Sequence, residues 1–406
     1  MQSASEAVSN KAQALAETRL LFDALRLGQT AENWSAACAE AGVNWDHLAV
    51  RAIVFGLAPL LHHRLTEWRA DFVSPRAAAK LAVTHQMQTK RAAAIFAQLG
   101  EVLAACAQRG LRPIALKGVH LAALVYPQPA LRPMNDIDLL FTPAELPAAQ
   151  AGLASLGYGG KHKSAEVGPG VVKHTSTFKR AETESLTPNP YLSTESERMI
   201  EPHTSLEEAW FGLKVDVTPG VRERAVEAEL GGQPGRVLSN EDLLLHLCVH
   251  FCFHFIQGSP AMVQLADLKE VTTLPMDWPA FTERAIACRA VPYALAALML
   301  AQKLLDAPVA DAHALPKLAN ATPEPMRRRI HQLGLADILQ RTQQTPLRTF
   351  GERLRRGLSD RAETARWAPN WRGRWRVWRT ALKFENTDTG RLLFDSFVAN
   401  FRKKQA

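Results

Sequence analysis

Apolar residues recur at spacings of three and four along the first 110 residues of the chain, as in ALAETRLLFDALRL and AAAIFAQLGEVLAACAQRG. This spacing predicts amphipathic helices that pack against one another. Ser74 followed by Pro75 is typical of a helix start, because a serine side chain caps backbone N–H groups and proline fits the first turn. Gly110 follows the last periodic residue and indicates a helix end.

The pattern changes after this glycine. LRPIALKG is a short apolar run that predicts a strand, VHLAALVY has helical spacing, and NDIDLLF alternates with a period of two, as in a second strand. A further helix follows, with Thr142 as its N-cap, Glu145 as the capping-box partner and Gly157 as its end. The order strand, helix, strand, helix therefore begins an α/β core.

Two more segments, residues 171–180 and 198–206, are β-branched or alternating enough to predict strands. The Ser-, Thr-, Glu- and Pro-rich residues 181–197 between them predict a surface loop. A second helical region opens at LSNEDLLLHLCVHFCFHFI, where Ser239 or Asn240 is the expected cap, and continues to about residue 345.

These patterns predict an α+β protein in which a mixed β-sheet core is flanked by N-terminal and C-terminal helical regions. We divide the chain into an N-terminal helical region (1–92), an α/β core (93–236), a C-terminal helical domain (237–345) and a basic segment rich in Trp and Arg (346–406).

Composition narrows the setting of the protein. The net charge of +8 and the pI near 9.4 suit an anionic partner without choosing one. The N-terminus lacks the basic and apolar regions of a secretory signal, and no run approaches the about 20 apolar residues of a membrane span. Five cysteines without CxxC spacing suit a reducing compartment. We therefore expect a cytoplasmic protein, with peripheral membrane contact as an alternative.

Two carboxylates interrupt the apolar run of the second strand, where Asp is disfavoured. Side chains at i and i+2 of a strand share a face, so Asp136 and Asp138 project together and repel each other. A divalent cation offsets this repulsion, and carboxylate oxygens suit Mg²⁺. The alternative is structural: Asp136 caps the strand start and Asp138 pairs with Arg132.

The spaced motifs LKG (116–118), RPMNDIDLL (132–140), IEPH (200–203), residues 238–254 and LADLKEV (265–271) occur in this order. Together they resemble the core of the DNA polymerase beta-like nucleotidyltransferase superfamily, in which a glycine turn leads into a helix and then a strand with an Asp-x-Asp pair. The resemblance is closer to one uncharacterised bacterial nucleotidyltransferase family and covers about residues 95–275.

The resemblance implies transfer of a nucleoside monophosphate from an NTP, with ATP as the expected one, to an acceptor with release of pyrophosphate. Asp136, Asp138 and Glu201 would bind Mg²⁺ or Mn²⁺ and serve as the catalytic carboxylates. Asp216 is the alternative third carboxylate, unless it caps a helix over 221–229. The acceptor, whether sugar, peptide, protein or small molecule, stays open, and a nucleic-acid partner is disfavoured.

Three residues are candidates for gripping the nucleotide phosphates. The superfamily's usual Gly-Ser or Gly-Gly is replaced here by Lys117-Gly118, so Gly118 would allow close backbone approach and Lys117 would supply charge. Lys117 is otherwise a solvated lysine at a strand end. Arg132 would orient a phosphate or else neutralise Asp138.

His246, His250 and His254 lie at i, i+4 and i+8 on one face of the predicted helix. They line the nucleotide or acceptor pocket, or are structural residues with Asp267 as a partner, or bind metal. The family resemblance favours His250, His254 and Asp267 as functional positions, and we select His250 and His254 as nucleotide-binding candidates. Cys248 and Cys252 are expected to fill the core.

The segment 366–384, RWAPNWRGRWRVWRTALKF, mixes Arg with Trp and shows no clear core pattern. It stacks on bases, lies at a membrane interface, or packs its Trp rings inward under the Arg stems. A second hypothesis follows from it: a non-catalytic scaffold with a nucleotidyltransferase fold that engages nucleic acid or an anionic membrane through this segment.

Overall fold

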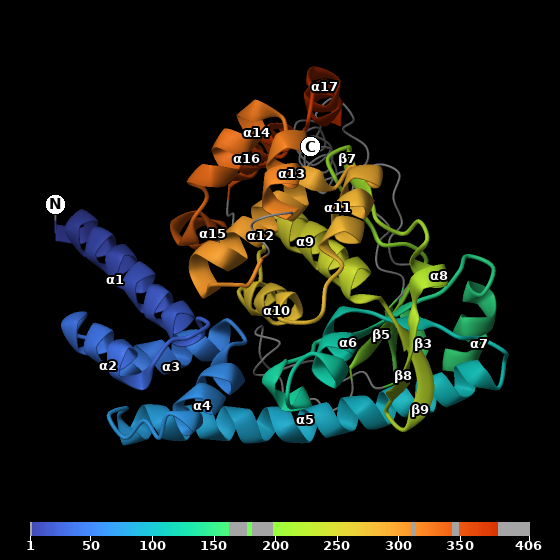
Figure 1. The fold of residues 1–406 in the computed structure, drawn as a ribbon, viewed down its shortest axis with the longest axis horizontal. Helices are drawn as coiled ribbons and strands as arrows, with labels where there is room; N and C mark the ends of the chain where they lie inside the picture. Colours follow the sequence, from blue (N-terminus) through green and yellow to red (C-terminus); the bar gives the residue numbers. More distant parts are fainter. Residues whose placement is uncertain (1, 162–176, 181–197, 310–313, 343–348, 381–406) are drawn as a thin grey trace, which may run out of the picture.

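The fold follows from a computed structural model that describes residues 2–161, 177–180, 198–309, 314–342 and 349–380. It confirms the predicted α+β class, with a mixed sheet between two helical regions (Figure 1). The predicted N-terminal helices are α1 (Gln2–Ala24), α2 (Ala31–Glu40), α3 (Trp45–Val54), α4 (Ala58–Glu67) and α5 (Pro75–Ala107).

Helix α5 is the long element that connects the N-terminal helices to the sheet. Its start is the predicted one, because the Ser74 side chain accepts a hydrogen bond from the Ala77 N–H and Pro75 is in the first turn. Gly110 has a φ of 70° just beyond its end. The helix packs against α3 and α4 along one part and against the sheet along another (Figure 1). Helix α5 continues through residues 92 and 93, where the N-terminal helical region was predicted to end and the α/β core to begin. The two predicted regions therefore share this helix.

The main sheet has seven strands in the order β3-β4-β5-β2-β1-β9-β8. Its centre is mixed: β2 runs parallel to β5 and antiparallel to β1, and β1 runs parallel to β9. The strands are β1 (Ile114–Ala115), β2 (Asp136–Leu140), β3 (Gly159–Lys161), β4 (Thr177–Lys179), β5 (Met199–His203), β8 (Val226–Leu230) and β9 (Gln233–Val237).

Most of the predicted core elements are present. β1, β2 and β5 are the expected strands, and β4 covers the described end of the strand predicted at 171–180. The rest of that strand and the loop predicted at 181–197 lie outside the described residues. Helix α6 (Lys117–Leu124) follows β1. The two bonds expected between Thr142 and Glu145 are present, from the Thr142 N–H to Glu145 and from the Glu145 N–H to Thr142, but they close a turn before α7 (Leu146–Ser155), whose N-cap is Glu145 and not the predicted Thr142.

The helix considered over 221–229 is wrong beyond its first turn. Residues Val221–Arg224 form the short α8, but the chain then enters β8 and returns along β9. The hairpin turn is Gly231-Gly232, with φ values of 59° and 71°, a conformation that glycine adopts without steric cost. The turn chemistry therefore overrides the helical preference of the preceding Glu and Ala residues.

This turn packs directly against α5. A Cβ built on Gly231 would lie 2.2 Å from the Phe96 carbonyl oxygen, and one built on Gly100 would lie 2.3 Å from the Gly231 carbonyl oxygen. Both glycines are therefore needed for the helix and hairpin backbones to approach each other.

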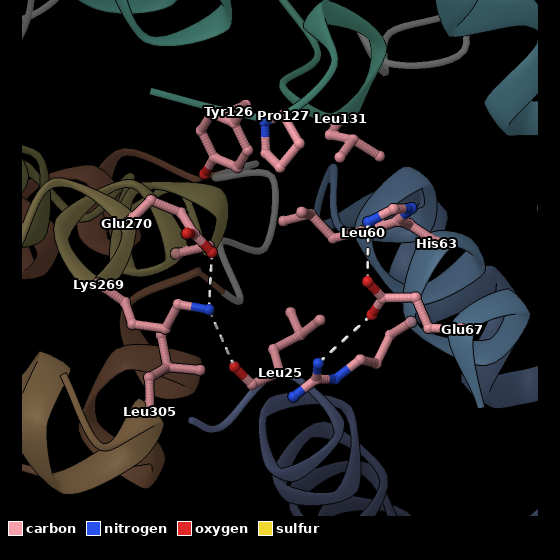
Figure 2. Close-up of a pocket in the computed structure, with 12 residues that line it drawn as sticks. Leu25, Leu60, His63, Glu67, Tyr126, Pro127, Leu131, Lys269, Glu270 and Leu305 are labelled. Carbon is pink, nitrogen blue, oxygen red and sulfur yellow. Dashed lines mark hydrogen bonds and ion pairs between the residues drawn. The ribbon is translucent and has the colours of Figure 1, made fainter. Parts of the chain in front are cut away.

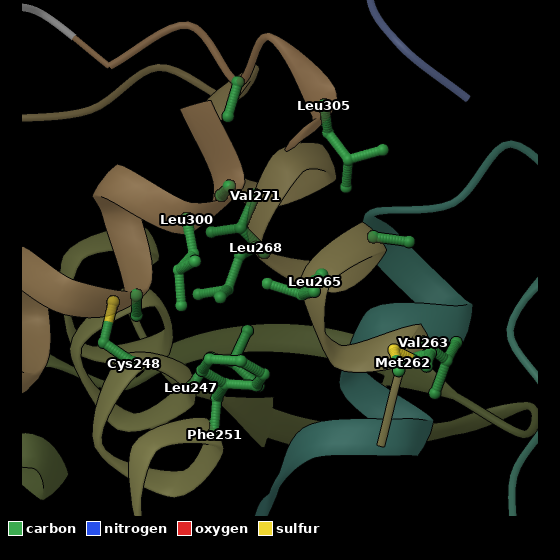
Figure 3. Close-up of a cluster of buried hydrophobic side chains, with 14 of the residues drawn as sticks. Leu247, Cys248, Phe251, Met262, Val263, Leu265, Leu268, Val271, Leu300 and Leu305 are labelled. Carbon is green, nitrogen blue, oxygen red and sulfur yellow. The ribbon is translucent and has the colours of Figure 1, made fainter. Parts of the chain in front are cut away.

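The second helical region begins with α9 (Asn240–Gln257), whose cap is Ser239, which accepts from the Asp242 N–H. Its core is built where α9, α10 and α12 pack, with Leu247, Phe251, Leu268 and Leu300 among the buried side chains (Figure 3). The remaining helices are α10 (Val263–Thr272), α11 (Trp278–Ala287), α12 (Val291–Leu305), α13 (Ala314–Ala321), α14 (Glu324–Gln332) and α15 (Leu335–Thr342). Cys248 and Cys252 are buried free thiols in this core.

The C-terminal segment has more structure than its sequence pattern indicates. It forms α16 (Phe350–Arg366) and α17 (Trp371–Arg379), which pack against each other. Trp367 is buried and stacks on Tyr293, with ring centroids 5.9 Å apart. Inward packing therefore holds for Trp367, whereas the three Trp residues of α17 are exposed. None of the described helices has the length and hydropathy needed to cross a membrane.

We predict that Gly231→Ala destabilises the fold by about 2–4 kcal/mol, because a left-handed alanine costs about 1–2 kcal/mol and the clash with α5 adds to it. Gly232→Ala is the matched control: its φ is also positive, but a Cβ there meets nothing within 4 Å. Denaturant unfolding of both variants measures the difference. Equal losses would show that the helix and hairpin do not need the close approach.

His120 on α6 makes stability depend on pH. Burial lowers its pKa to about 4, and its Nδ1 has no hydrogen-bond partner among the described residues. As pH falls below 6.5, His120 becomes protonated in the unfolded chain but stays neutral in the folded one. The free energy of unfolding therefore falls. The loss reaches about 3 kcal/mol near pH 4, at about 1.4 kcal/mol per unit of pKa.

His120→Leu removes this contribution, so the variant loses less stability than the wild type between about pH 7 and about pH 4.5. The measurement is the free energy of unfolding of both proteins at the two pH values. Parallel pH dependences would contradict the assignment.

Candidate functional site

Asp138 and Glu201 face each other across two neighbouring strands. The parallel pairing of β2 with β5 puts these two residues in register, and both side chains are buried, with 2% and 4% of their surface exposed. His203 is two residues further along β5 and therefore on the same side as Glu201. Among the described residues, these three offer ligand atoms that all lie within 4.8 Å of one another.

Lys117 brings a positive charge to this group. Its Nζ lies 3.2 Å from Oδ2 of Asp138, and Nε2 of His203 lies 2.5 Å from Oδ1 of the same carboxylate. Lys117 has a φ of 39° at the junction of β1 and α6, a left-handed conformation that is uncommon outside glycine. Such backbone strain is often stored at functional sites.

The pKa of Lys117 reflects two opposing effects. Burial acts to lower the pKa, but the charges of Asp138, Asp136 and Glu208 raise it by more, so the pKa lies above its ordinary value. Lys117 therefore keeps its proton at neutral pH, and it is not the solvated lysine that one of the sequence interpretations allowed.

Glu208 is a residue of this group that the sequence analysis missed. It lies on β6 (Glu207–Trp210), which pairs with β7 (Leu213–Asp216) in a separate two-stranded sheet, and it is buried. Its Oε1 lies 2.8 Å from Nδ1 of His250 on α9. The only local signal for this hairpin is Gly212, which suits the two-residue turn Phe211-Gly212, where the structure has positive φ at both residues, as in a type I′ hairpin. This signal indicates a turn but does not place Glu208 beside His250.

The histidines of α9 therefore extend from this group. The ring centroids of His246 and His250 are 5.8 Å apart and those of His250 and His254 are 4.3 Å apart. His254 is only partly buried, and its Nδ1 lies 3.3 Å from the Ser259 carbonyl oxygen. The hydrogen-bonding contact of His250 with Glu208 connects this row of histidines to the carboxylate group.

Arg132 and Asp267 form an ion pair with each other, 2.7 Å apart, at the segment that leads into β2. Asp267 is fully buried and also accepts a hydrogen bond from the Tyr126 hydroxyl. Arg132, a candidate for neutralising Asp138 or holding a phosphate, thus anchors this segment to α10. Asp267, a candidate partner of the histidines, is instead bound by Arg132 and Tyr126.

Gly118 has a packing role in the first turn of α6. A Cβ at this position would lie 3.2 Å from Cγ of Met134, two residues before β2. The absence of a side chain therefore lets α6, and with it Lys117, lie close to the strand that carries the Asp pair. No side chain in the described part of the chain caps α6, so its first N–H groups carry no cap from those residues.

Asp136 and Asp216 lie outside the three-residue group. Asp136 opens β2 opposite Met199 and is partly exposed, and its charge acts on Lys117. Asp216 is exposed at the end of β7, where it accepts from the N–H of Thr218 and closes a turn. The carboxylate that the fold brings opposite Asp138 is therefore Glu201.

A cavity of about 180 Å³ is lined by residues of α4 and α10 together with Tyr126 (Figure 2). Its charged residues neutralise one another: Lys269 pairs with Glu270, while His63 and Arg64 pair with Glu67. Its lining contains none of the carboxylates described above, so it is separate from the Asp138 group.

The chemistry of the donor set fits a divalent metal ion. Two buried carboxylates at close range repel and are costly to desolvate unless a cation compensates. Carboxylate oxygens bind hard divalent cations such as Mg²⁺ and Mn²⁺, and an imidazole nitrogen is a ligand for divalent transition metals. Asp138, Glu201 and His203 therefore form a candidate metal centre.

The comparisons with known proteins agree with this geometry. Residues 41–306, well over half of the chain, match the model of a family described as uncharacterised nucleotidyltransferase. The match begins further towards the N-terminus than the sequence motifs indicate and includes helices α3 to α5. Neither a curated protein nor a solved structure matches the chain. The chain belongs to this family of uncharacterised nucleotidyltransferases.

Proposed function

We propose that the protein transfers a nucleoside monophosphate from an NTP, with ATP as the expected substrate, to an acceptor nucleophile, and that the transfer depends on Mg²⁺ or Mn²⁺. The family supports a transferase of this class. The observation that carries the proposal is the pairing of Asp138 and Glu201 in register on β2 and β5, with Lys117 3.2 Å from Asp138.

Asp138 and Glu201 would hold the metal ion, with His203 or Asp136 completing the set on the same two strands. When bound, such an ion neutralises phosphate charge and polarises the phosphorus for attack. The strands hold the carboxylates in place before substrate arrives, because each is buried and fixed by the β2–β5 register. Preorganisation of this kind lowers the cost of reaching the transition state.

Lys117 would bind the triphosphate. It keeps its proton, is largely buried and lies next to Asp138, so its ammonium can pair with a phosphate oxygen that enters the group. It also begins α6, whose uncapped N–H groups point along the helix axis towards an incoming anion. Gly118 contributes by permitting the close packing of α6, and Arg132 by fixing the segment before β2.

The Glu208–His250 pair would position a proton acceptor beside the phosphates. A neutral imidazole that donates Nδ1–H to Glu208 presents Nε2 as an acceptor atom. The carboxylate also fixes the ring orientation, as carboxylates do for catalytic histidines. This arrangement favours a role for His250, with His254 one turn further along α9, on the nucleotide or acceptor side.

The scaffold hypothesis predicts that these buried groups are dispensable. In a protein without catalytic activity nothing would offset the cost of burying Asp138, Glu201 and Glu208 together, because each carboxylate loses its hydration and the three repel one another. The carboxylate cluster therefore favours the enzyme.

We expect Asp138→Asn and Glu201→Gln each to reduce metal-dependent nucleotide incorporation by more than about 100-fold, since even loss of a residue behind a metal ligand costs about 10–100-fold. Asp216→Asn is the matched control and stays within about twofold of the wild type, because its carboxylate closes a surface turn. The assay follows label from the α-phosphate of each NTP with Mg²⁺.

Calorimetric titration with Mn²⁺ gives a second readout that does not need the acceptor. Binding by the wild type and its loss in Asp138→Asn support the proposal. Wild-type Mn²⁺ affinity in Asp138→Asn, or a loss in Asp216→Asn as large as in Glu201→Gln, would rule out the assigned carboxylates.

We predict that Glu208→Gln lowers kcat by about 10–100-fold with little change in the KM for NTP, because it removes the group that orients His250. Glu207→Gln is the control on the same strand: that side chain pairs with Lys214 at the surface. Melting temperatures of both variants separate a folding defect from a catalytic one. A Glu208→Gln variant with wild-type kcat would show that the pair is only structural.

A further inference from the structure

A cleft of about 490 Å³ lies beside α17, between β7, the connection from α11 to α12, and the residues that precede α17. It contains none of the residues of the Asp138 group. Its charged lining residues are all basic: Lys214, Arg289, Arg372 and Arg376. Positive charges gathered around one concave surface focus the field there and attract anions.

Three of these cations lack an acidic partner. Lys214 pairs with Glu207, but Arg289, Arg372 and Arg376 form no ion pair within the part of the chain that the structure describes. Arg289 also has a φ of 56°, so a left-handed backbone turns the chain at the rim of the cleft. Three guanidinium groups with no internal counter-charge are suited to phosphate, which arginine binds through paired N–H donors.

The walls of the cleft are apolar rather than polar. They include Val291, Pro292, Pro323 and Pro369, and Ile286 at the rim is 50% exposed. A sugar–phosphate chain offers little for such walls to bind. The glycerol and upper acyl carbons of a phospholipid can pack against these apolar walls while the phosphate lies at the basic rim.

Helix α17 carries an exposed aromatic stripe beside this cleft. Trp371, Trp375 and Trp378 are 71%, 61% and 39% exposed. At about 100° per residue they fall within an arc of about 60°, and Val377, which is fully buried, lies about 100–160° away from them around the helix. Figure 1 shows α17 at the outer edge of the molecule. Exposed Trp residues gathered in this way mark an interaction surface, and Trp favours the membrane–water interface.

We propose that α17 and this cleft form a docking surface for an anionic phospholipid bilayer. The Trp stripe inserts at the level of the headgroups, and Arg289, Arg372 and Arg376 bind lipid phosphates. Both features are required, because the aromatic stripe supplies apolar contact and the arginines select negative headgroups. The proposal does not rest on the nucleotidyltransferase reaction.

The test uses the full-length protein and sedimentation with two kinds of vesicle, phosphatidylcholine alone and phosphatidylcholine with about a third phosphatidylglycerol. The wild type is expected to bind the anionic vesicles at least about tenfold more tightly. Changing the three Trp residues of α17 to Ala, or the three arginines of the cleft to Gln, weakens this binding by at least about tenfold.

A matched control removes the same number of charges elsewhere, with Arg19→Gln, Arg69→Gln and Lys90→Gln. These residues are exposed and do not line the cleft. The control is expected to bind anionic vesicles within about twofold of the wild type. Circular dichroism melts of all three variants confirm that each is folded.

Three outcomes would overturn the proposal. One is equal binding of the wild type to neutral and anionic vesicles. Another is a loss in the control variant as large as in the cleft variant, which would indicate net charge alone. The last is tight binding of a single-stranded oligonucleotide that the Trp and Arg variants lose, without binding to vesicles, which would assign the surface to nucleic acid.

Discussion

The pairing of Asp138 with Glu201 across β2 and β5 is the constraint around which the centre of this protein is arranged. Two carboxylates buried in register cannot both keep their charge without cationic compensation. Lys117 supplies part of it from the left-handed turn between β1 and α6, and His203 lies against the other oxygen of Asp138.

The surrounding structure keeps these groups in place. Gly118 lets α6 approach Met134, and the buried pair of Arg132 with Asp267 ties the segment before β2 to α10. Removing one partner of such a buried pair costs about 3–5 kcal/mol, so this segment is firmly anchored. The Glu208–His250 contact connects the same centre to α9. Gly118 and Arg132, which the sequence suggests as phosphate-binding residues, thus also hold the segments that carry Lys117 and Asp138 in place.

How far the sequence predicts the site depends on the range of the interaction. Asp136 and Asp138 stand out because a period of two and an apolar run are local patterns, and Glu201 follows from its motif and strand. Glu208 does not, because only the folding of the β6–β7 hairpin against α9 brings it near Lys117. The partner of Arg132 is 135 residues away, and no local pattern identifies it. The helix considered over 221–229 fails because the Gly231-Gly232 turn outweighs local helix preference.

The most direct test of the central claim is a crystal structure of the protein with Mn²⁺ and a non-hydrolysable ATP analogue. We predict anomalous scattering from Mn²⁺ between the carboxylates of Asp138 and Glu201, with the Lys117 ammonium on a phosphate oxygen. A nucleotide bound elsewhere, or a Lys117–Asp138 contact that persists with no manganese beside either carboxylate, would contradict the account.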